Sequence, residues 1–416
     1  MQTQLAESFR DSALGREADA ILRQCVHCGF CTATCPTYQL LGDELDGPRG
    51  RIYLIKQVLE GTPADTTIRS HLDRCLTCRS CETTCPSGVQ YSRLLDIGRR
   101  VVAQQLPRRG LDRVMRYTLS QGLPRPWLFR PAVALGQVLR PLLPSVLADK
   151  LPTVSKATTV TLWPTPRQSR RMLALAGCVQ PSLAPNINAA TARVLDRLGI
   201  SLYEVPKAGC CGALRFHLDE QAAALDDMRR NIDAWWPEID AGVEAIVVTA
   251  SGCGVQVKEY GHCLRHDPDY ASKAARISAL CRDPSEVLLA ESGRLQPLLS
   301  QFAAPRGKLA FHAPCSLQHG LKIRGVIEGM LSTLGYELTP VAEGHLCCGS
   351  AGTYSLLQGR IAGRLRDNKL TALNAGAPLR IATANIGCLT HLQAGSELPV
   401  EHWIELLDRA LCGMKD

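Results

Sequence analysis

The chain carries the stretch Cys25-x-x-Cys28-x-x-Cys31-x-x-x-Cys35-Pro36, and this stretch decides the fold of its N-terminal part. The same spacing returns fifty residues later as Cys75-x-x-Cys78-x-x-Cys81-x-x-x-Cys85-Pro86. Cysteines separated by two residues can be turned inward by one tight loop, so that three thiolates bind three irons of a cubane cluster. The fourth cysteine, which precedes a proline, leaves that loop and can reach the other cluster.

The two runs therefore predict two [4Fe-4S] clusters with crossed ligation, which also clamps the two runs together. One cluster is expected on Cys25, Cys28, Cys31 and Cys85, and the other on Cys75, Cys78, Cys81 and Cys35. Disulfides fit poorly because the N-terminal residues lack the apolar core and cleavage site of a secretory signal. Structural zinc uses paired ligands, which leaves the third cysteine and the Cys-Pro ending without a reason.

Length and composition set the wider frame. At 416 residues the chain is too long for a ferredoxin alone, and a hydrophobic content of 45% is ordinary for a globular protein with a real core. Nineteen cysteines without a secretory signal or a long apolar run predict a cytoplasmic, reduced protein. Nothing in the chain matches a nucleotide fingerprint of the G-x-G-x-x-G or P-loop type.

The formal net charge of +8 is concentrated in one segment. Residues 99–171 hold 14 Lys and Arg against Asp112 and Asp149, a local excess of +12. Many prolines rule out one long helix there. Its apolar middle, Trp127 to Leu147 with interspersed arginines, suits a membrane surface or the groove of a partner, and a solvated linker is the alternative. No reading motif supports binding to nucleic acid.

Local patterns before this segment predict helices at 7–24, 52–60 and 66–74 around the two cysteine runs. After it, two copies of one βαβ unit are expected. The first has strands at 172–176, 202–205 and 245–249 and a helix at 188–198. The second has strands at 309–311, 337–341 and 380–383 and a helix at 326–334.

Each copy carries its own set of cysteines, and in both copies 31 residues separate the first cysteine from a Cys-Cys-Gly triplet. The sets are Cys178, Cys210, Cys211 and Cys253 in the first copy, and Cys315, Cys347, Cys348 and Cys388 in the second. Loops at the ends of parallel strands gather such residues into one crevice. Four sulfur ligands suit an iron-sulfur cluster or zinc, and buried thiols without metal are the alternative.

The remaining cysteines and the histidines are not among the expected ligands. Cys263, Cys281 and Cys412 have no counterpart in the other copy and are expected to be structural. His27 is expected to tune or shield a cluster rather than to bind it, because polar neighbours shift cluster potentials. Core positions or positions beside the second set are expected for His312, His319, His345 and His391.

These features together resemble a known family. Two ferredoxin runs followed by two Cys-Cys-Gly repeats are similar to the iron-sulfur subunits that partner flavin dehydrogenases of 2-hydroxy acids and of glycerol 3-phosphate. The repeats are also similar to the catalytic subunit of heterodisulfide reductase. Four stretches look specifically like the bacterial glycolate oxidase iron-sulfur subunits: residues 25–38, 42–51, 249–253 and 383–388.

The resemblance implies an electron-transfer subunit of a complex. An FAD-containing glycolate oxidase subunit would oxidise glycolate to glyoxylate, and this chain, together with other subunits of the complex, would carry electrons one at a time toward a membrane quinone. The expected location is cytoplasmic, peripheral on the cytoplasmic face of the inner membrane. Alternatives are the equivalent subunit for lactate or glycerol 3-phosphate, a thiol-disulfide enzyme like heterodisulfide reductase, and a zinc-dependent nucleic-acid-binding protein.

One departure from the family pattern weakens the thiol-disulfide alternative. The full repeat ends in Cys-x-x-Cys, but Ala250 and Asn385 stand at the first of those two positions. Four cysteines per copy leave five-cysteine cluster chemistry in doubt.

The predicted fold class is α+β and multidomain: a helical two-cluster ferredoxin domain followed by two tandem α/β Cys-Cys-Gly repeat domains. The expected divisions are a ferredoxin domain at 1–100, a basic, proline-rich linker or docking segment at 101–168, a first repeat at 169–304 and a second at 305–416.

Overall fold

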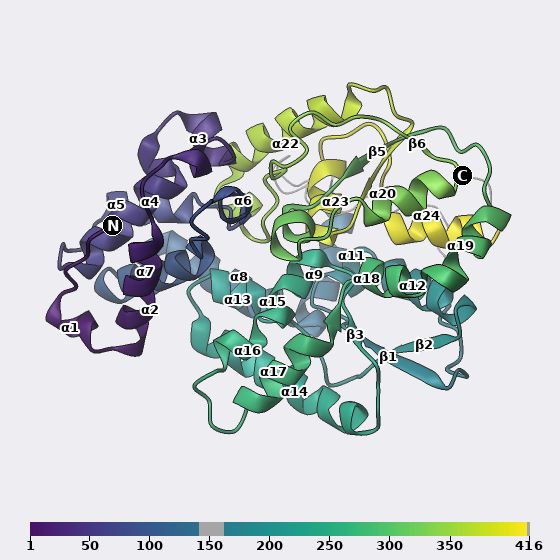
Figure 1. Ribbon diagram of the computed structural model, residues 1–416, viewed down its shortest axis with the longest axis horizontal. Coiled ribbons are helices and arrows are strands. Elements are labelled where there is room, and N and C mark those ends of the chain that lie inside the picture. The colour runs from purple at the N-terminus through teal and green to yellow at the C-terminus, as the bar shows by residue number, and fades with distance from the viewer. Residues whose placement is uncertain (141–161, 414–416) are drawn as a thin grey trace.

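The computed structural model describes residues 1–140 and 162–413 of the chain. A helical N-terminal part, purple to blue in Figure 1, lies beside two α/β units, the first teal and the second green to yellow. This arrangement confirms the expected fold class. Across 1–140 and 162–413, no helix is both long enough and apolar enough to cross a membrane.

The N-terminal helices pack around the cysteine runs in one core that includes Cys25, Cys75 and Cys81. The main helices are α2 (Ala13–Gln24), α4 (Pro48–Leu59), α5 (Thr66–Asp73) and α7 (Tyr91–Gln105). The single helix expected at 7–24 is wrong, because α1 (Glu7–Arg10) ends at its C-cap Asp11 and Ser12 then caps α2 by accepting a hydrogen bond from the Gly15 amide. Helix α4 begins earlier than expected, at Pro48, whose ring suits a first helical turn.

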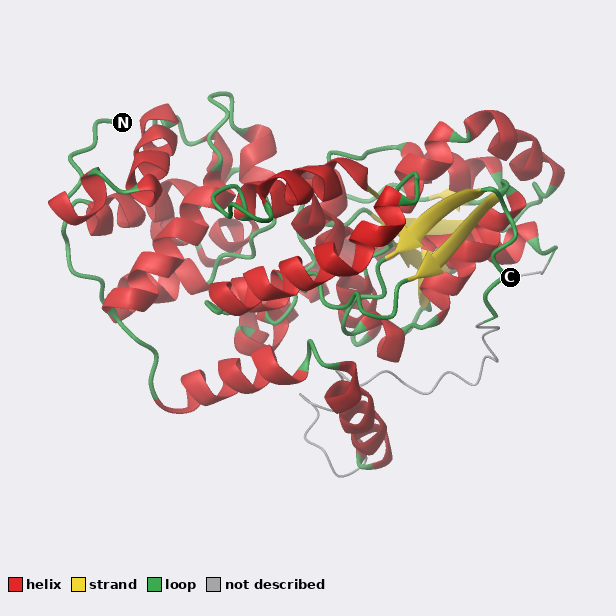
Figure 2. Cartoon of the chain, turned by 90° about the horizontal axis from the view of Figure 1, so that it is seen from below, coloured by secondary structure: helices red, strands yellow, loops and turns green. Residues whose placement is uncertain are grey.

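The basic segment begins within the last turns of α7 and then forms two helices, α8 (Gly110–Gly122) and α9 (Pro126–Val138). The helix that leads into the grey trace in Figure 2 is α9, at the edge of the molecule. Short helices here agree with the expectation that prolines prevent one long helix. Residues 141–161, which include the end of the apolar middle, lie outside the described ranges.

The two repeats contain parallel sheets of identical topology. The first sheet has the order β2-β1-β3-β4 and the second the order β6-β5-β7-β8. Duplication of one unit is thereby confirmed. The strands of the first sheet are β1 (Arg170–Ala174), β2 (Ile200–Glu204), β3 (Ile246–Val247) and β4 (Cys281–Arg282). Those of the second are β5 (Lys308–His312), β6 (Glu337–Leu338), β7 (Arg380–Thr383) and β8 (Val400–His402).

One continuous hydrophobic core joins the two sheets. It is filled by helices from both repeats: α12 (Asn186–Arg197), α18 (Pro284–Ala290), α19 (Ser292–Gln301), α20 (Val326–Thr333) and α24 (Trp403–Leu411). The opposite faces pack on separate helices, α14 (Gln221–Asp240) and α17 (Ala271–Leu280) in the first repeat and α22 (Gly359–Asn374) in the second. The repeats are therefore one packed unit, whose strand ends meet the ferredoxin part.

Candidate metal centres and central cavity

The two ferredoxin loops share one unusual backbone. The third and fifth residues of each run have positive φ angles, at His27 (57°) and Gly29 (84°) and again at Thr77 (52°) and Arg79 (60°). A left-handed conformation costs a residue other than glycine about 1–3 kcal/mol, so it persists only where the surroundings enforce it. The same conformation at matched positions indicates that each loop turns its own thiols inward in the same way.

The first group of thiols contains a member from the second run. Burial raises the pKa of Cys31 to about 11, and the neighbouring thiols of Cys25, Cys85 and Cys28 add to this effect. The same four cysteines line one small pocket. The structure therefore brings Cys85 beside the first run.

The second group likewise contains a member from the other run, Cys35. Burial raises the pKa of Cys81 well above its usual value, and so do the thiols of Cys78, Cys75 and Cys35. Each group gathers four cysteines around one site, where each thiolate would repel the others without a cation among them. This is the donor set of an iron-sulfur cluster, so the residues fit the cofactor. Ligation by these eight residues stays a prediction.

A buried ionic network positions Cys35. The Asp46 carboxylate, 1% exposed, lies 2.9 Å from His71 Nδ1 and accepts a hydrogen bond of 2.9 Å from Arg74. Arg51 donates to the same carboxylate at 3.4 Å and to the Thr37 hydroxyl at 3.2 Å. That hydroxyl lies 3.3 Å from Cys35 Sγ. The stretch between the two runs thus holds Cys35 against the second run.

In the first repeat the four cysteines form a row. The thiol of Cys178 lies beside that of Cys210, and this contact together with burial raises the pKa of Cys178. Cys211 in turn contacts Cys210 and Cys253. Gly212 follows the pair with φ of 90°, and a Cβ there would lie 2.9 Å from the Ala224 carbonyl oxygen. The third residue of the triplet must therefore be glycine.

The second repeat contains a matching row of four cysteines. Cys315 Sγ lies 3.7 Å from Cys347 Sγ, and Cys348 contacts both Cys347 and Cys388. Gly349 has φ of 91°, matching Gly212. Both rows bring together the cysteines that the sequence predicted as sets. Four sulfurs in a row provide the donors of an iron-sulfur or zinc centre, so these residues also fit a metal.

The residues at the missing cysteine positions offer no replacement ligand. Ala250 has no donor atom, and it precedes α15 (Ser251–Lys258). Asn385 caps α23 (Ile386–Gln393), where its Oδ1 accepts a hydrogen bond of 3.2 Å from the Gly387 amide. Its Nδ2 donates to the Ser316 hydroxyl at 3.4 Å.

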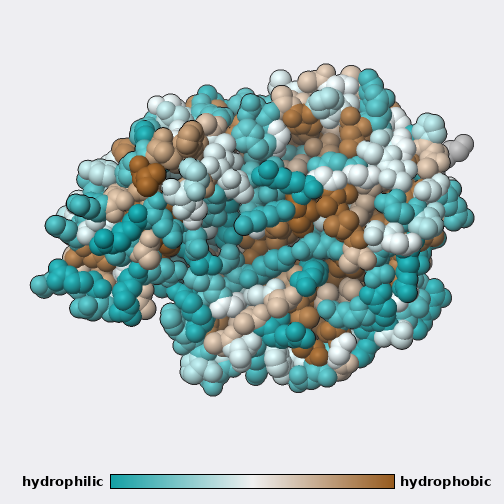
Figure 3. Space-filling model, in the orientation of Figure 1, coloured by the Kyte–Doolittle hydropathy of each residue, from teal (hydrophilic) through white to brown (hydrophobic). Residues whose placement is uncertain are grey.

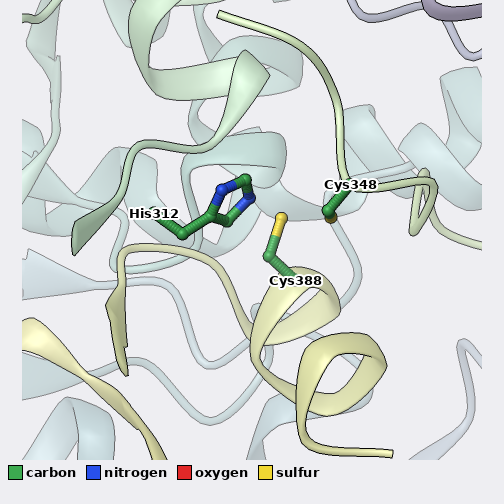
Figure 4. A group of neighbouring side chains, drawn as sticks. All are labelled: His312, Cys348 and Cys388. Carbon is green, nitrogen blue, oxygen red and sulfur yellow. The ribbon is translucent and has the colours of Figure 1, made fainter. Parts of the chain in front are cut away.

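One of the histidines expected in the core or beside the second set, His312, approaches the second row. His312 ends β5, and one of its ring nitrogens lies within 4.8 Å of the sulfurs of Cys348 and Cys388. Figure 4 shows the imidazole directed toward both. Burial lowers the pKa of His312 to about 3, so the ring is neutral. The available signal was its position, three residues before Cys315.

The second ferredoxin group lies against the second repeat. Burial and the thiols of Cys315 and Cys35 raise the pKa of Cys78, which places Cys78 beside both groups. The contact is held by a hydrogen bond of 2.8 Å between the Thr83 hydroxyl and His319 Nδ1. An ion pair of 2.9 Å between Arg79 and Glu259 ties the same loop to the first repeat.

A central cavity of about 910 Å³ is shared by the second ferredoxin group and the two repeat rows. Both repeat rows and Cys78 contribute to its wall, and so does the unassigned Cys263. The helix α9 contributes Phe129 and Val133, and further apolar residues are Leu214, Phe216 and Leu356. The space-filling view shows apolar surface gathered in the furrow between the two repeats (Figure 3). The other two unassigned cysteines differ, since Cys281 is buried and Cys412 exposed.

One carboxyl group of α7 faces this cavity. Asp96 is half-buried, and it forms part of the cavity wall. Burial raises the pKa of Asp96 to about 7 against the lowering effect of Arg99, Arg79 and Arg100, and Glu259 raises it further. A group with this pKa holds and releases protons near neutral pH.

Known protein families match the ferredoxin part and each of the two repeats separately. Residues 21–89 match the 4Fe-4S dicluster domain family, which confirms the expected clusters, and residues 172–258 and 309–393 each match the Cysteine-rich domain family. The chain is 57% identical to the glycolate oxidase iron-sulfur subunit of Escherichia coli strain K12, over 99% of both chains. It is 31% identical to the probable glycolate oxidase iron-sulfur subunit of Bacillus subtilis strain 168, over 95% of this chain and 92% of that one. Lactate utilization protein A of Geobacillus thermodenitrificans is 26% identical over 56% of this chain and 95% of its own.

Proposed function

Because the chain belongs to the family of glycolate oxidase iron-sulfur subunits, we propose that it carries electrons for a complex that oxidises glycolate to glyoxylate. In this proposal a separate FAD subunit takes two electrons from glycolate, and a membrane quinone finally accepts them. The bound clusters supply one-electron carriers. The chain's own residues hold those carriers, fix their order and shape the site of the acceptor.

The order of the ligand groups supports a direction for the electrons. The first ferredoxin group, with the exposed Cys28, faces outward and is the entry side in this proposal. The second group contacts the first through shared loops and the second repeat through Cys78. The repeat rows end at the central cavity, which is therefore the exit side.

The observation that carries the proposal is the cavity wall. Apolar pockets of about 300–1,000 Å³ with a few polar groups are typical ligand sites. This one holds both cysteine rows on one side and the apolar residues of α9 on another, which suits a flat, hydrophobic acceptor. The four-cysteine rows and the residues at 250 and 385 support electron relay there rather than reduction of a disulfide substrate.

Asp96 has a defined part in this chemistry. A quinone that receives two electrons must also gain two protons to become a quinol. We assign Asp96 as the proton donor: its carboxyl group protonates a quinone oxygen and is reprotonated from solvent before the second proton transfer. General acids of this kind contribute rate factors of about 10²–10⁴.

Reconstitution tests the function. The purified chain, mixed with glycolate and a water-soluble quinone, is expected to show no turnover, because no flavin fingerprint is present and α-hydroxy acids need a hydride acceptor. Addition of the FAD subunit should start reduction of the quinone at the expense of glycolate. Turnover by this chain alone, free of flavin, would contradict the proposal. Turnover with lactate but none with glycolate would assign the complex to a different 2-hydroxy acid.

The outer surface of α8 and α9 supports a membrane location. Both helices expose large apolar side chains, and basic residues lie among them. The apolar group consists of Leu111, Val114, Met115, Tyr117, Trp127, Leu128, Leu135 and Val138. The basic group consists of Arg109, Arg113 and Arg130, all exposed. We name these residues together the α8–α9 patch and propose that it lies on an anionic membrane, with the inner face of α9 at the cavity.

Charge removal from the patch is expected to weaken membrane binding. Each basic residue near an anionic surface contributes about 1 kcal/mol, so replacing Arg109, Arg113 and Arg130 by Gln should weaken binding about 100-fold. The measurement is co-flotation of the complex with phosphatidylglycerol vesicles, at low and high salt. Phosphatidylcholine vesicles should bind weakly in either case.

A matched triple variant controls for net charge. It replaces Arg276, Arg360 and Arg364, which are exposed on α17 and α22. Its binding should equal that of the unmodified complex. If salt and the patch variant leave flotation unchanged, the segment is a linker. If the patch variant loses the FAD subunit instead of the vesicle, it is a subunit contact.

A further inference from the structure

The side chain of His312 is buried without a hydrogen-bond partner at Nε2. Its exposed fraction is 2%, and within residues 1–140 and 162–413 nothing bonds to that nitrogen. Leaving a buried polar group unsatisfied destabilises the folded state. Such a group therefore calls for an unseen partner.

The surroundings of His312 identify the partner's chemistry. The ring is directed at the sulfurs of Cys348 and Cys388, and all three donor atoms lie within 4.8 Å of one another (Figure 4). Atoms that share one metal ion are separated by such distances. Neutral imidazole nitrogen and thiolate sulfur together are a common donor set for zinc and occur in some iron-sulfur centres.

The first repeat provides an internal comparison. The position three residues before its first cysteine is Leu175, which is buried and has no donor atom. Both repeats lack the cysteine that would stand at Ala250 or Asn385, yet among the residues that the structure describes only the second repeat places an imidazole nitrogen within metal-ligand distance of its row. The difference between His312 and Leu175 therefore separates two otherwise matched sites.

We propose that His312 is a nitrogen ligand of the metal centre of the second repeat, together with cysteines of the row Cys315, Cys347, Cys348 and Cys388. The first repeat then carries an all-cysteine centre. The inference rests on the proposed function to the extent that the rows hold metal. A neutral nitrogen in place of a thiolate leaves the second centre less negative, which favours its reduced state.

Spectroscopy of the anaerobically purified complex tests the ligand directly. Pulsed paramagnetic resonance on protein labelled with ¹⁵N-histidine is expected to show a strongly coupled nitrogen at one iron centre. If the metal is zinc, X-ray absorption at the zinc edge should show one nitrogen at about 2.0–2.1 Å among sulfurs. His312→Leu, which copies the first repeat, should remove that nitrogen signal.

Two further variants separate the outcomes. His312→Cys replaces nitrogen by sulfur and should retain the metal while losing the nitrogen signal, so a folding defect in the leucine variant is recognised. Cys388→Ser should lower the metal content of the complex. If Cys388→Ser leaves the metal content unchanged, the second repeat holds no metal, and both this inference and the relay role of the row are wrong. If metal is lost there but His312→Leu keeps the nitrogen signal, only the ligand assignment is wrong.

Discussion

A Cys35→Ser variant is expected to lose the cluster of the second ferredoxin run, although Cys35 belongs to the first run. The reason is geometric, since the thiol of Cys35 lies with Cys78 and Cys81, whereas Cys85 lies with Cys31. Removal of one ligand of four opens a cubane cluster, so about four of roughly eight ferredoxin irons should be lost. Electron flow from glycolate to quinone should fall by at least 100-fold, because the chain of carriers is broken.

The measurement is iron analysis combined with paramagnetic resonance of the reduced complex. The spectrum of Cys35→Ser should match that of Cys75→Ser, and the spectrum of Cys85→Ser should match that of Cys25→Ser. Cys412→Ser is the control, because Cys412 is exposed and outside all four groups. If Cys35→Ser and Cys25→Ser lose the same cluster, the ligation is not crossed.

An Asp96→Asn variant is expected to reduce quinone about 100-fold more slowly, because an amide cannot supply the proton. Reduction of ferricyanide, which takes one electron and no proton, should be unchanged. In the unmodified complex the acid form of Asp96 is present below its pKa of about 7, so quinone reduction should fall as the pH rises through neutrality. This pH dependence should disappear in the variant.

Several charged or titratable groups surround Asp96 and are the other possible sources of a pH dependence. They come from its own helix and from the two elements packed against it: Arg99, Arg100, Arg79, Glu259 and Cys263. Of these, Glu259 is held by its ion pair with Arg79. The control is Asp240→Asn at the exposed end of α14, which should behave like the unmodified complex with both acceptors. Equal losses with quinone and with ferricyanide would show that Asp96 only supports the fold.

The paired repeats show which kinds of contact a linear pattern can reveal. Strands and helices of both copies were predictable because apolar runs of fixed period alternate with Cys and Gly turns. The strands β4 and β8 were missed, since Cys281–Arg282 and Val400–His402 are short and not apolar runs. The shared core was also missed, because each helix of the layer between the sheets has an apolar face that does not say which sheet it covers.

The cysteine groups could be read from the order of residues alone, because ligand spacing is a local property. A tight loop sets which thiols converge, and the returning gap of 31 residues marks the duplicated unit. The residues that surround those groups depend on how the folded elements pack. Asp96 reaches the cavity and His312 reaches Cys348 and Cys388 because separate elements are packed at fixed distances. Such contacts depend on how whole faces of helices and sheets bury one another, and no short stretch of the chain encodes that choice.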